Sequence, residues 1–199
     1  MSSPSVYFDA CCFIDMAKMK LSIPTLGERE KHIFFCRKFL EASRAKEGAV
    51  YTSTATMAEC VKLQDTSQPE GHQTVEDERV QKLFKGMLQS GTSGVMPVAV
   101  TPGIAEAARN LRWKSKITIK PMDAIHVATA IAMKCTHFVT TDGKLGADNI
   151  VRIAALGLTV CRADGLSSLL PSKYSQIEIP TKPKRGTAAP ATPTTTTPA

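Results

Sequence analysis

Four acidic residues of this chain hold positions from which they could act together on one ligand: Asp9, Glu59, Asp123 and Asp142. Asp9 ends the apolar run 6–8, and Asp142 ends the run 138–141. Both runs are rich in β-branched and aromatic residues, so we expect two short buried strands. Ligands of an open parallel α/β sheet bind beyond the carboxyl ends of its strands. Carboxylates gathered there repel one another unless a hard cation neutralises them, which predicts a site for Mg²⁺ or Mn²⁺.

The chemistry that such a site favours is hydrolysis of a phosphodiester. That reaction needs a nucleophilic water and a stabilised leaving oxygen, and a bound divalent metal supplies both. We expect Asp9 and Asp142 to be direct metal ligands, because strand ends hold their side chains rigidly. Asp123 is expected to join them, and Glu59 to act through water or a second metal. No histidine base is required, since metal-bound hydroxide can attack.

The charge of the chain favours a polyanionic partner. The formal net charge is +7, and the isoelectric point is near 9.2. Five cations lie within the twelve residues 109–120, just ahead of Asp123, and Trp113 stands among them. The indole could stack an unpaired base of RNA while four of these cations contact its phosphates: Arg109, Arg112, Lys114 and Lys116. The alternative is a solvated helix end with Trp113 partly in the core.

Strand and helix signals alternate along the chain, which predicts a parallel sheet with helices on both faces. We expect strands over residues 6–8, 49–51, 95–100, 137–141 and 158–161. Helices are expected over 12–19, 28–46, 53–63, 75–88, 102–113, 121–133, 147–156 and 166–170. The expected fold class is therefore α/β.

We expect one domain over residues 1–170 and a tail over residues 171–199. The tail begins with a basic cluster, and from residue 186 onward it contains only Gly, Thr, Ala and Pro. Such a segment cannot offset its ordering entropy by burial, so the tail is expected to be disordered. The stretch 64–94 is polar in its first part and is expected to be an insertion.

Cysteine usage and the start of the chain indicate a cytoplasmic protein. The six cysteines show no C-x-x-C pair and no zinc-ligand spacing, so we expect buried free thiols in a reducing compartment. The first residues lack the pattern of a signal peptide. No run of about 18 apolar residues is present, so we expect no membrane association through a spanning helix.

Four short segments resemble, in order, the motifs of PIN-domain ribonucleases: residues 6–11, 56–60, 123–130 and 138–142. The third is the most specific, and the resemblance covers residues 5–162. It implies an α/β/α sandwich around a parallel sheet and Mg²⁺- or Mn²⁺-dependent hydrolysis of RNA by the four acids. Many bacterial and archaeal members are VapC-type toxins inhibited by an antitoxin protein. An antitoxin partner and a homodimer are therefore also expected from the resemblance.

The same residues have simpler interpretations. Asp123 stands in the first turn of a helix, where the helix dipole favours an acid without any ligand. Asp9 and Asp142 could be turn residues that close strands. For the whole chain, the alternative is a catalytically silent module of the same fold that binds RNA or a protein. Two further acids are expected to be ordinary surface charges: Asp15 and Asp148.

Two more residues could support the acids. Thr140 points to the same side of its strand as Asp142 and could orient a metal-bound water, although β-propensity alone explains a threonine there. His126 lies one turn beyond Asp123 on the same helix face and could hydrogen-bond that carboxylate or a phosphate. We interpret His126 as a packed or orienting residue rather than a catalytic one.

Overall fold

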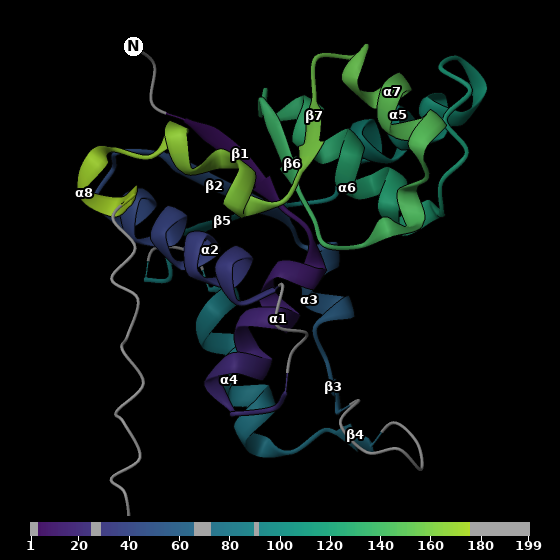
Figure 1. Cartoon of the computed structure of the whole chain (residues 1–199). Coiled ribbons are helices and arrows are strands. Elements are labelled where there is room, and N and C mark those ends of the chain that lie inside the picture. Colours follow the sequence, from purple (N-terminus) through teal and green to yellow (C-terminus); the bar gives the residue numbers. More distant parts are fainter. Residues whose placement is uncertain (1–3, 25–28, 66–72, 90–91, 176–199) are drawn as a thin grey trace, which may run out of the picture.

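A five-stranded parallel sheet forms the centre of the molecule (Figure 1). The computed structural model describes residues 4–24, 29–65, 73–89 and 92–175. The strands are β1 Ser5–Phe8, β2 Ala49–Ser53, β5 Val95–Val98, β6 His137–Val139 and β7 Thr159–Cys161. They are ordered β5-β2-β1-β6-β7, and each neighbouring pair is parallel. The predicted parallel α/β sheet is confirmed, with strand bounds that differ from the expected ones by a few residues.

Helices connect the strands. The α-helices are α1 Ala10–Lys20, α2 Arg29–Arg44, α3 Ala55–Glu59, α4 Glu78–Leu88, α5 Pro102–Trp113, α6 Pro121–Ala132, α7 Ala147–Ala154 and α8 Ser172–Ser175. Two 3₁₀ helices follow β6 and β7, η1 Gly143–Leu145 and η2 Ala163–Leu169. Capping side chains mark the start of two α-helices. Thr101 caps α5 by accepting the Ile104 N–H at 3.3 Å, and Asp77 caps α4. A first-turn proline opens both α5 and α6, where its missing N–H costs nothing.

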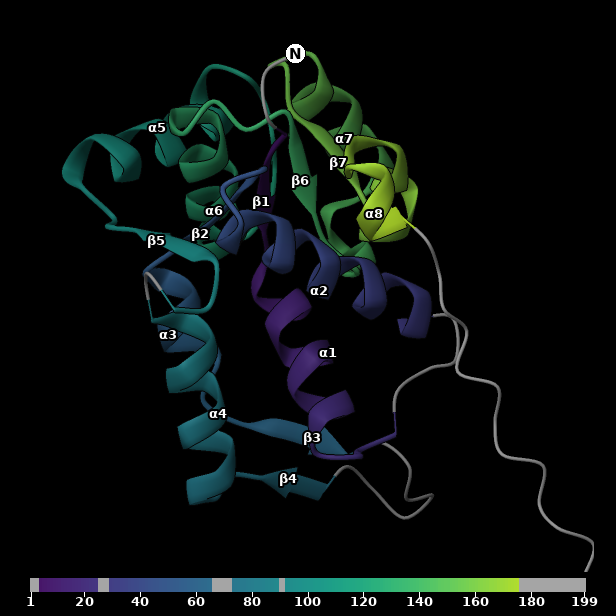
Figure 2. The same cartoon turned by 90° about the vertical axis from the view of Figure 1, so that its left-hand side faces the viewer.

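The alternation of side chains along each strand divides the core into two layers. In β1, Val6 and Phe8 pack on one face with α1, α2 and α4, whereas Tyr7 packs on the other face with α5, α6 and α7. In β6, Val139 joins the first core and Phe138 the second. Figure 2 shows α2 across one face of the sheet and α5 and α6 behind it. The protein is therefore an α/β/α sandwich, as predicted.

The parallel register places the ends of β1 and β6 side by side. Phe8 pairs with Val139, and the Asp9 N–H then donates to the Val139 carbonyl at 3.1 Å. Asp9 and Thr140, the residues that follow the two strands, are thus neighbours at the carboxyl edge of the sheet. Helices α1 and α4 continue beyond this edge in both views (Figures 1 and 2).

A small antiparallel hairpin was missed by the sequence patterns. Strands β3 Leu63–Asp65 and β4 Gln73–Val75 pair where a helix ending at residue 63 and another starting at residue 75 were expected. Leu63 explains the difference, because it is fully buried in the core formed with α1. The burial of a leucine side chain contributes about 1.5–3 kcal/mol, which exceeds the local helix preference of one turn.

Two predictions fall partly or wholly outside the described residues. The expected disordered tail is described only to Ser175, where α8 packs against α2, and residues 176–199 lie beyond it. Within the expected insertion, residues 66–72 and 90–91 are likewise not described. Among the described residues, no helix combines the length and apolarity needed to cross a bilayer.

Candidate active site at the carboxyl edge of the sheet

One hydroxyl joins the two acids that follow strands. The Thr140 O–H donates to Asp9 Oδ2 at 2.8 Å, and Thr140 Oγ1 accepts the Asp142 N–H at 3.0 Å. The other carboxylate oxygen of Asp9 accepts the Ala10 N–H at 2.8 Å and so caps α1. Asp9 is therefore fixed by both the helix and the neighbouring strand. Thr140 therefore hydrogen-bonds the Asp9 carboxylate directly, whereas the sequence suggested that it would orient a metal-bound water.

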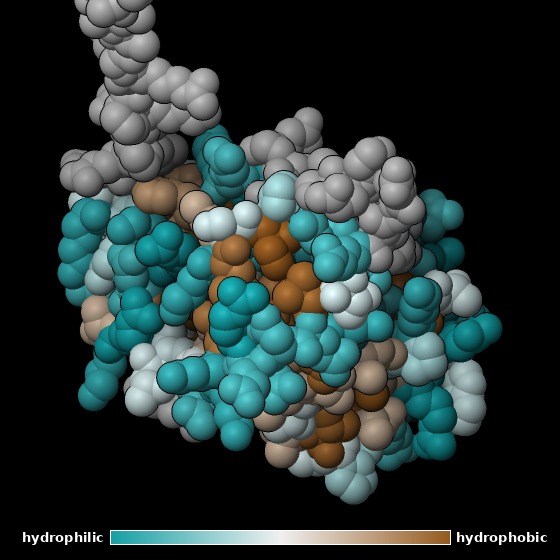
Figure 3. Space-filling view, turned by 90° about the horizontal axis from the view of Figure 1, so that it is seen from below, coloured by the Kyte–Doolittle hydropathy of each residue, from teal (hydrophilic) through white to brown (hydrophobic). Residues whose placement is uncertain are grey.

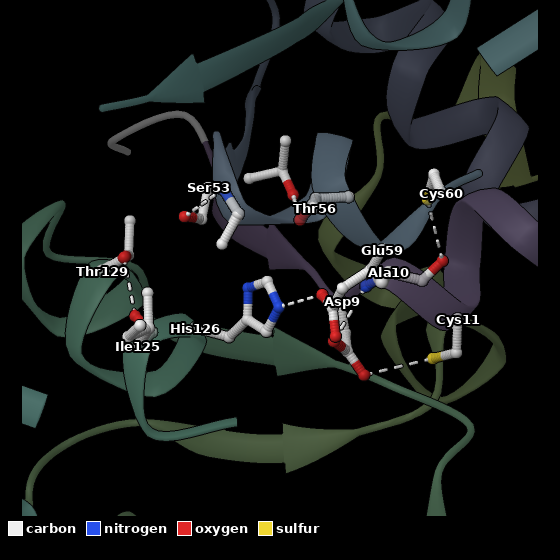
Figure 4. A network of polar contacts seen from close by, with 12 residues as sticks. Asp9, Ala10, Cys11, Ser53, Thr56, Glu59, Cys60, Ile125, His126 and Thr129 are labelled. Carbon is white, nitrogen blue, oxygen red and sulfur yellow. Dashed lines mark hydrogen bonds and ion pairs between the residues drawn. The ribbon is translucent and has the colours of Figure 1, made fainter. Parts of the chain in front are cut away.

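Cys11 lies at this site, although its sequence position indicated only packing. Its Sγ is 3.3 Å from Asp9 Oδ2 (Figure 4). The same atom is 3.2 Å from Thr140 Oγ1 and accepts the Thr141 N–H at 3.2 Å. The neighbouring Cys12 thiol, burial and the Asp9 carboxylate all raise the pKa of Cys11 well above its ordinary value. Cys11 is thus a neutral thiol that supports Asp9. Its spacing of two residues from Asp9, in the first turn of α1, was the available signal.

Glu59 is held by a buried histidine from the second core. Glu59 Oε2 and His126 Nε2 are 2.5 Å apart (Figure 4). On the other side of the ring, His126 Nδ1 is 2.7 Å from the Tyr7 hydroxyl. His126 and Tyr7 are fully buried, whereas the Glu59 side chain is 30% exposed. With Glu59 ionised, Nε2 carries the proton and donates to it. The sequence suggested a bond from His126 to Asp123, but the tertiary contact with Glu59 takes its place.

The pKa of His126 reflects the acidic surroundings. Burial alone would lower it, but the hydrogen bond to Glu59 and the nearby Asp9, Glu59 and Asp123 carboxylates outweigh burial and raise it. The protonated form of this buried histidine is favoured because several negative charges lie close to it.

Asp123 completes the group from the first turn of α6. Burial raises the pKa of Asp123, and the Asp9, Asp142 and Glu59 carboxylates raise it further, while His126 opposes the shift. Asp123 is therefore close enough to the other three predicted acids to be influenced by their charges. Their donors are all carboxylate oxygens, the chemistry that Mg²⁺ and Mn²⁺ prefer.

No three of the four carboxylates bring their oxygens within 4.8 Å of one another. Within the described parts of the chain, the only group that brings three His, Cys, Asp or Glu donor atoms within 4.8 Å of one another is Cys12, His32 and Cys36. A wider spacing suits mutually repelling carboxylates. It also suits Mg²⁺, which keeps several waters and needs one or two direct carboxylate ligands.

Comparison with known proteins identifies the fold family. The family model described as "PIN domain" matches residues 6–147, which include all four acids. The chain belongs to the PIN-domain family. Among solved structures, the crystal structure of VapBC2 from Rickettsia felis bound to a DNA fragment from their promoter is similar, at 15% identity and a TM-score of 0.48. The alignment covers 78% of this chain and 98% of that one. A search of curated proteins found no match.

PIN domains are generally nucleases that use divalent metal ions. In this PIN domain the four acids come from four different segments: the ends of β1 and β6, the end of α3 and the start of α6. A long-range arrangement of this kind is not explained by the local roles of a strand-closing turn or a helix dipole. Those roles are nevertheless present, because Asp9 caps α1 and Asp123 lies in the first turn of α6.

The predicted RNA-binding cations lie on or just after α5. Each of the four is exposed: Arg109, Arg112, Lys114 and Lys116. Trp113 is 60% exposed, so the alternative in which it lies partly in the core describes it poorly. The basic segment is separate from the four acids but precedes α6, the helix that carries Asp123.

The two acids expected at the surface have different environments. Asp148 is exposed, as predicted. Asp15 is not a surface charge: it is 1% exposed, pairs with Arg29 at 2.9 Å and accepts the Thr141 O–H at 3.0 Å. Because Thr141 precedes Asp142, this contact braces the end of β6 against α1. The sequence missed this role because Arg29 and Thr141 are distant along the chain.

The Cys12–His32–Cys36 group of this PIN domain has the donor types of a soft-metal site, but its hydrogen bonds oppose one. His32 Nδ1 accepts the Ala163 N–H at 3.0 Å, so the neutral ring carries its proton on Nε2, 3.3 Å from Cys36 Sγ. Nε2 consequently has no lone pair for a metal. Burial raises the pKa of both thiols, which disfavours the thiolates that metals bind. The group is a packed interior contact.

His32 makes the fold sensitive to acid. Burial lowers the pKa of His32 to about 4, from an ordinary value of 6.5. Between these values the unfolded chain binds a proton that the native protein does not, so stability falls as pH falls. We expect a loss of about 2 kcal/mol between pH 7 and pH 5 from this group. Urea titrations at both pH values measure it.

A matched pair of variants isolates the contribution of His32. His32→Gln should remove most of the loss between pH 7 and pH 5, whereas His137→Gln, at a partly exposed histidine, should retain most of it. An unchanged pH dependence in His32→Gln would contradict the assignment.

Proposed function

We propose that this PIN domain is a Mg²⁺- or Mn²⁺-dependent endoribonuclease in which Asp9, Glu59, Asp123 and Asp142 form the catalytic and metal-binding group. The observation that carries the proposal is the geometry at the carboxyl edge of the sheet, where the Thr140 hydroxyl joins the Asp9 side chain to the Asp142 backbone. The pKa of Asp123, which burial and then the other three carboxylates raise, supports it. Asp9 and Asp142 are the proposed direct ligands, because the Thr140 hydroxyl contacts the side chain of one and the backbone of the other.

Each residue has a defined task in this proposal. A divalent metal, when bound, supplies a water of lowered pKa and neutralises charge on the phosphate. Asp9, held by Ala10 and Thr140, presents a carboxylate in a fixed direction. Asp123 contributes negative charge from α6. Glu59 is oriented by His126, which Tyr7 orients in turn, so His126 is a positioning residue that reaches the phosphate only through Glu59.

A cleavage assay tests the proposal. Purified protein should cut single-stranded RNA with Mg²⁺ or Mn²⁺ and stop when EDTA is added. The products are expected to carry 5′-phosphate and 3′-hydroxyl ends, the usual outcome in the family, in which water attacks the phosphorus and the 3′ oxygen leaves. Duplex RNA and DNA of the same sequence serve as comparison substrates. Equal cleavage in EDTA, or cleavage of DNA alone, would contradict the proposed function.

We also propose a protein partner of the antitoxin kind, as in VapC-type toxins. Hollows of about 730 and 470 Å³ lie beside α4, and each is lined by apolar and charged residues together. The apolar ones include Met57 and Phe84 in the first hollow and Met19 and Met87 in the second. Met57 and Met19 are each 43% exposed. Apolar side chains gather on this lower face among hydrophilic ones (Figure 3). Exposed apolar patches of this kind favour protein contacts.

A further inference from the structure

A hollow of about 250 Å³ lies between α5 and α6, which pack side by side on one face of the sheet (Figure 1). One wall is a single face of α5, since Ala105, Ala108 and Arg112 follow helical spacing. Alanine at the first two positions leaves the space open. The volume is slightly below the range of roughly 300–1,000 Å³ for drug-sized ligands, and so suits one small planar group.

Trp113 borders this hollow and is unusually exposed. The indole is 60% exposed, and the Arg109 guanidinium lies 4.6 Å from the ring centroid. The Arg109 contact orients the ring without burying it. A rigid aromatic side chain beside an open apolar space is a stacking platform for another flat ring.

The surroundings of Trp113 favour an anionic ligand. Five exposed cations lie on α5 or just after it: Arg109, Arg112, Lys114, Lys116 and Lys120. Among the described residues, the one ion pair found for this group joins Arg109 to Glu106 at 3.5 Å, with both side chains exposed. Solvent-exposed pairs of this kind contribute little. The cations therefore retain their attraction for phosphates.

The hollow and the acidic group share one helix, α6. Ala124 and Ile125 line it, and they stand between Asp123 and His126 in the sequence. A ligand that combines a flat ring at Trp113 with charged units beyond it can follow α6, the helix that also carries Asp123. Single-stranded RNA has this combination of a base and a phosphate in each nucleotide.

We propose that the hollow binds one unpaired base of single-stranded RNA, stacked on Trp113, while Arg112, Lys114 and Lys116 contact the adjoining phosphates. This subsite rests on the proposed ribonuclease function and adds to it a means of positioning the strand. Stacking accepts any base, because every base offers a π-face. The subsite therefore selects unpaired strands over duplexes without reading sequence.

The single tryptophan of the chain allows a direct test without cleavage. The full chain in EDTA is titrated with an oligouridylate of about ten nucleotides, within the site sizes of single-strand binders, and Trp113 fluorescence is recorded. A second titration uses an abasic oligomer of the same length, which keeps the phosphates and lacks the bases. We expect saturable quenching with the first oligomer and little with the second.

Variants separate stacking from charge. Trp113→Ala should weaken binding of the oligouridylate by roughly 5- to 150-fold, as for other stacked bases, and Trp113→Phe should retain most of it. These variants are measured by anisotropy of a labelled oligomer. Ala105→Leu fills the hollow and should also weaken binding. Ala107→Leu, at an exposed position of the same helix outside the hollow, is the matched control and should bind normally.

The outcomes distinguish this subsite from the ribonuclease function. If the parent cuts RNA but Trp113→Ala and Ala105→Leu bind it as tightly as the parent, the base subsite is wrong and the nuclease proposal stands. Equal binding of abasic and normal oligomers would also overturn the subsite. If Trp113→Ala converts a dimer into a monomer in light scattering, the hollow is an interface between two copies instead. If the parent neither binds nor cuts RNA, both proposals fail.

Discussion

Asparagine in place of Asp9 is expected to lower the rate of RNA cleavage by roughly a hundredfold to ten-thousandfold, since metal coordination supplies several kcal/mol and each 1.36 kcal/mol is a factor of ten. The fold should be retained. The Asn oxygen can still accept the Ala10 N–H, and its amide can donate to Thr140 Oγ1 once that hydroxyl turns. The initial rate with Mg²⁺ measures the effect, and circular dichroism checks the fold.

The matched control for this change is Asp148→Asn. Asp148 is an exposed acid in the first turn of α7, so its replacement alters net charge by the same amount without touching the four acids. The control should cut RNA at the parent rate. A variant at Asp9 that also cuts at the parent rate would remove Asp9 from the active site and, with it, the proposed mechanism.

The positions of Asp9 and Asp142 after strands could be predicted because their signals are local. Asp9 and Asp142 follow apolar runs that form buried strands, and the parallel topology of an alternating α/β chain brings strand ends together. The same reasoning identified Thr140, which lies between them in the hydrogen-bond network. Because β1 and β6 are neighbours in the sheet, the residues that follow them in the sequence lie close together in the structure.

The contacts of His126 and Asp15 could not be predicted in the same way. Helical spacing relates His126 to Asp123, but it contains no information about α3, which brings Glu59 to within 2.5 Å of the imidazole. Asp15 lies on α1 among apolar residues, and the Arg29 that neutralises it comes from the start of α2. Which residues pair with His126 and Asp15 depends on how the helices pack against one another. The spacing of residues within one segment gives no information about that packing.

The hairpin β3–β4 was missed for a related reason. Its strands are three residues each, too short for an alternating pattern to be distinguished from a helix end. Asp77 was the overlooked signal, because a helix that begins after it leaves residues 73–75 free to pair with β3.

Metal binding separates an active nuclease from a silent module of the same fold. Mn²⁺ at 100 times its dissociation constant is expected to stabilise the protein by about 2.7 kcal/mol. For a domain of this size, that corresponds to a rise of about 5–11 °C in Tm. The physical reason is that burial and the nearby carboxylates both oppose the ionised form of Asp123 and raise its pKa, and a bound cation offsets both. Differential scanning calorimetry with and without Mn²⁺ measures the shift.

Asp123→Asn gives a second test of this prediction. The substitution should raise the Tm without metal and reduce the rise in Tm that Mn²⁺ causes. Without metal, the variant should be more stable than the parent at pH 7, since it removes a carboxylate whose ionisation is opposed by burial and by the neighbouring acids. With Mn²⁺, its Tm should rise much less than that of the parent, because one oxygen ligand has lost its charge. Asp148→Asn should retain the full Mn²⁺ response. A parent protein whose Tm does not respond to Mn²⁺ would support the silent module, and a destabilised Asp123→Asn would show that the carboxylate is held by other contacts.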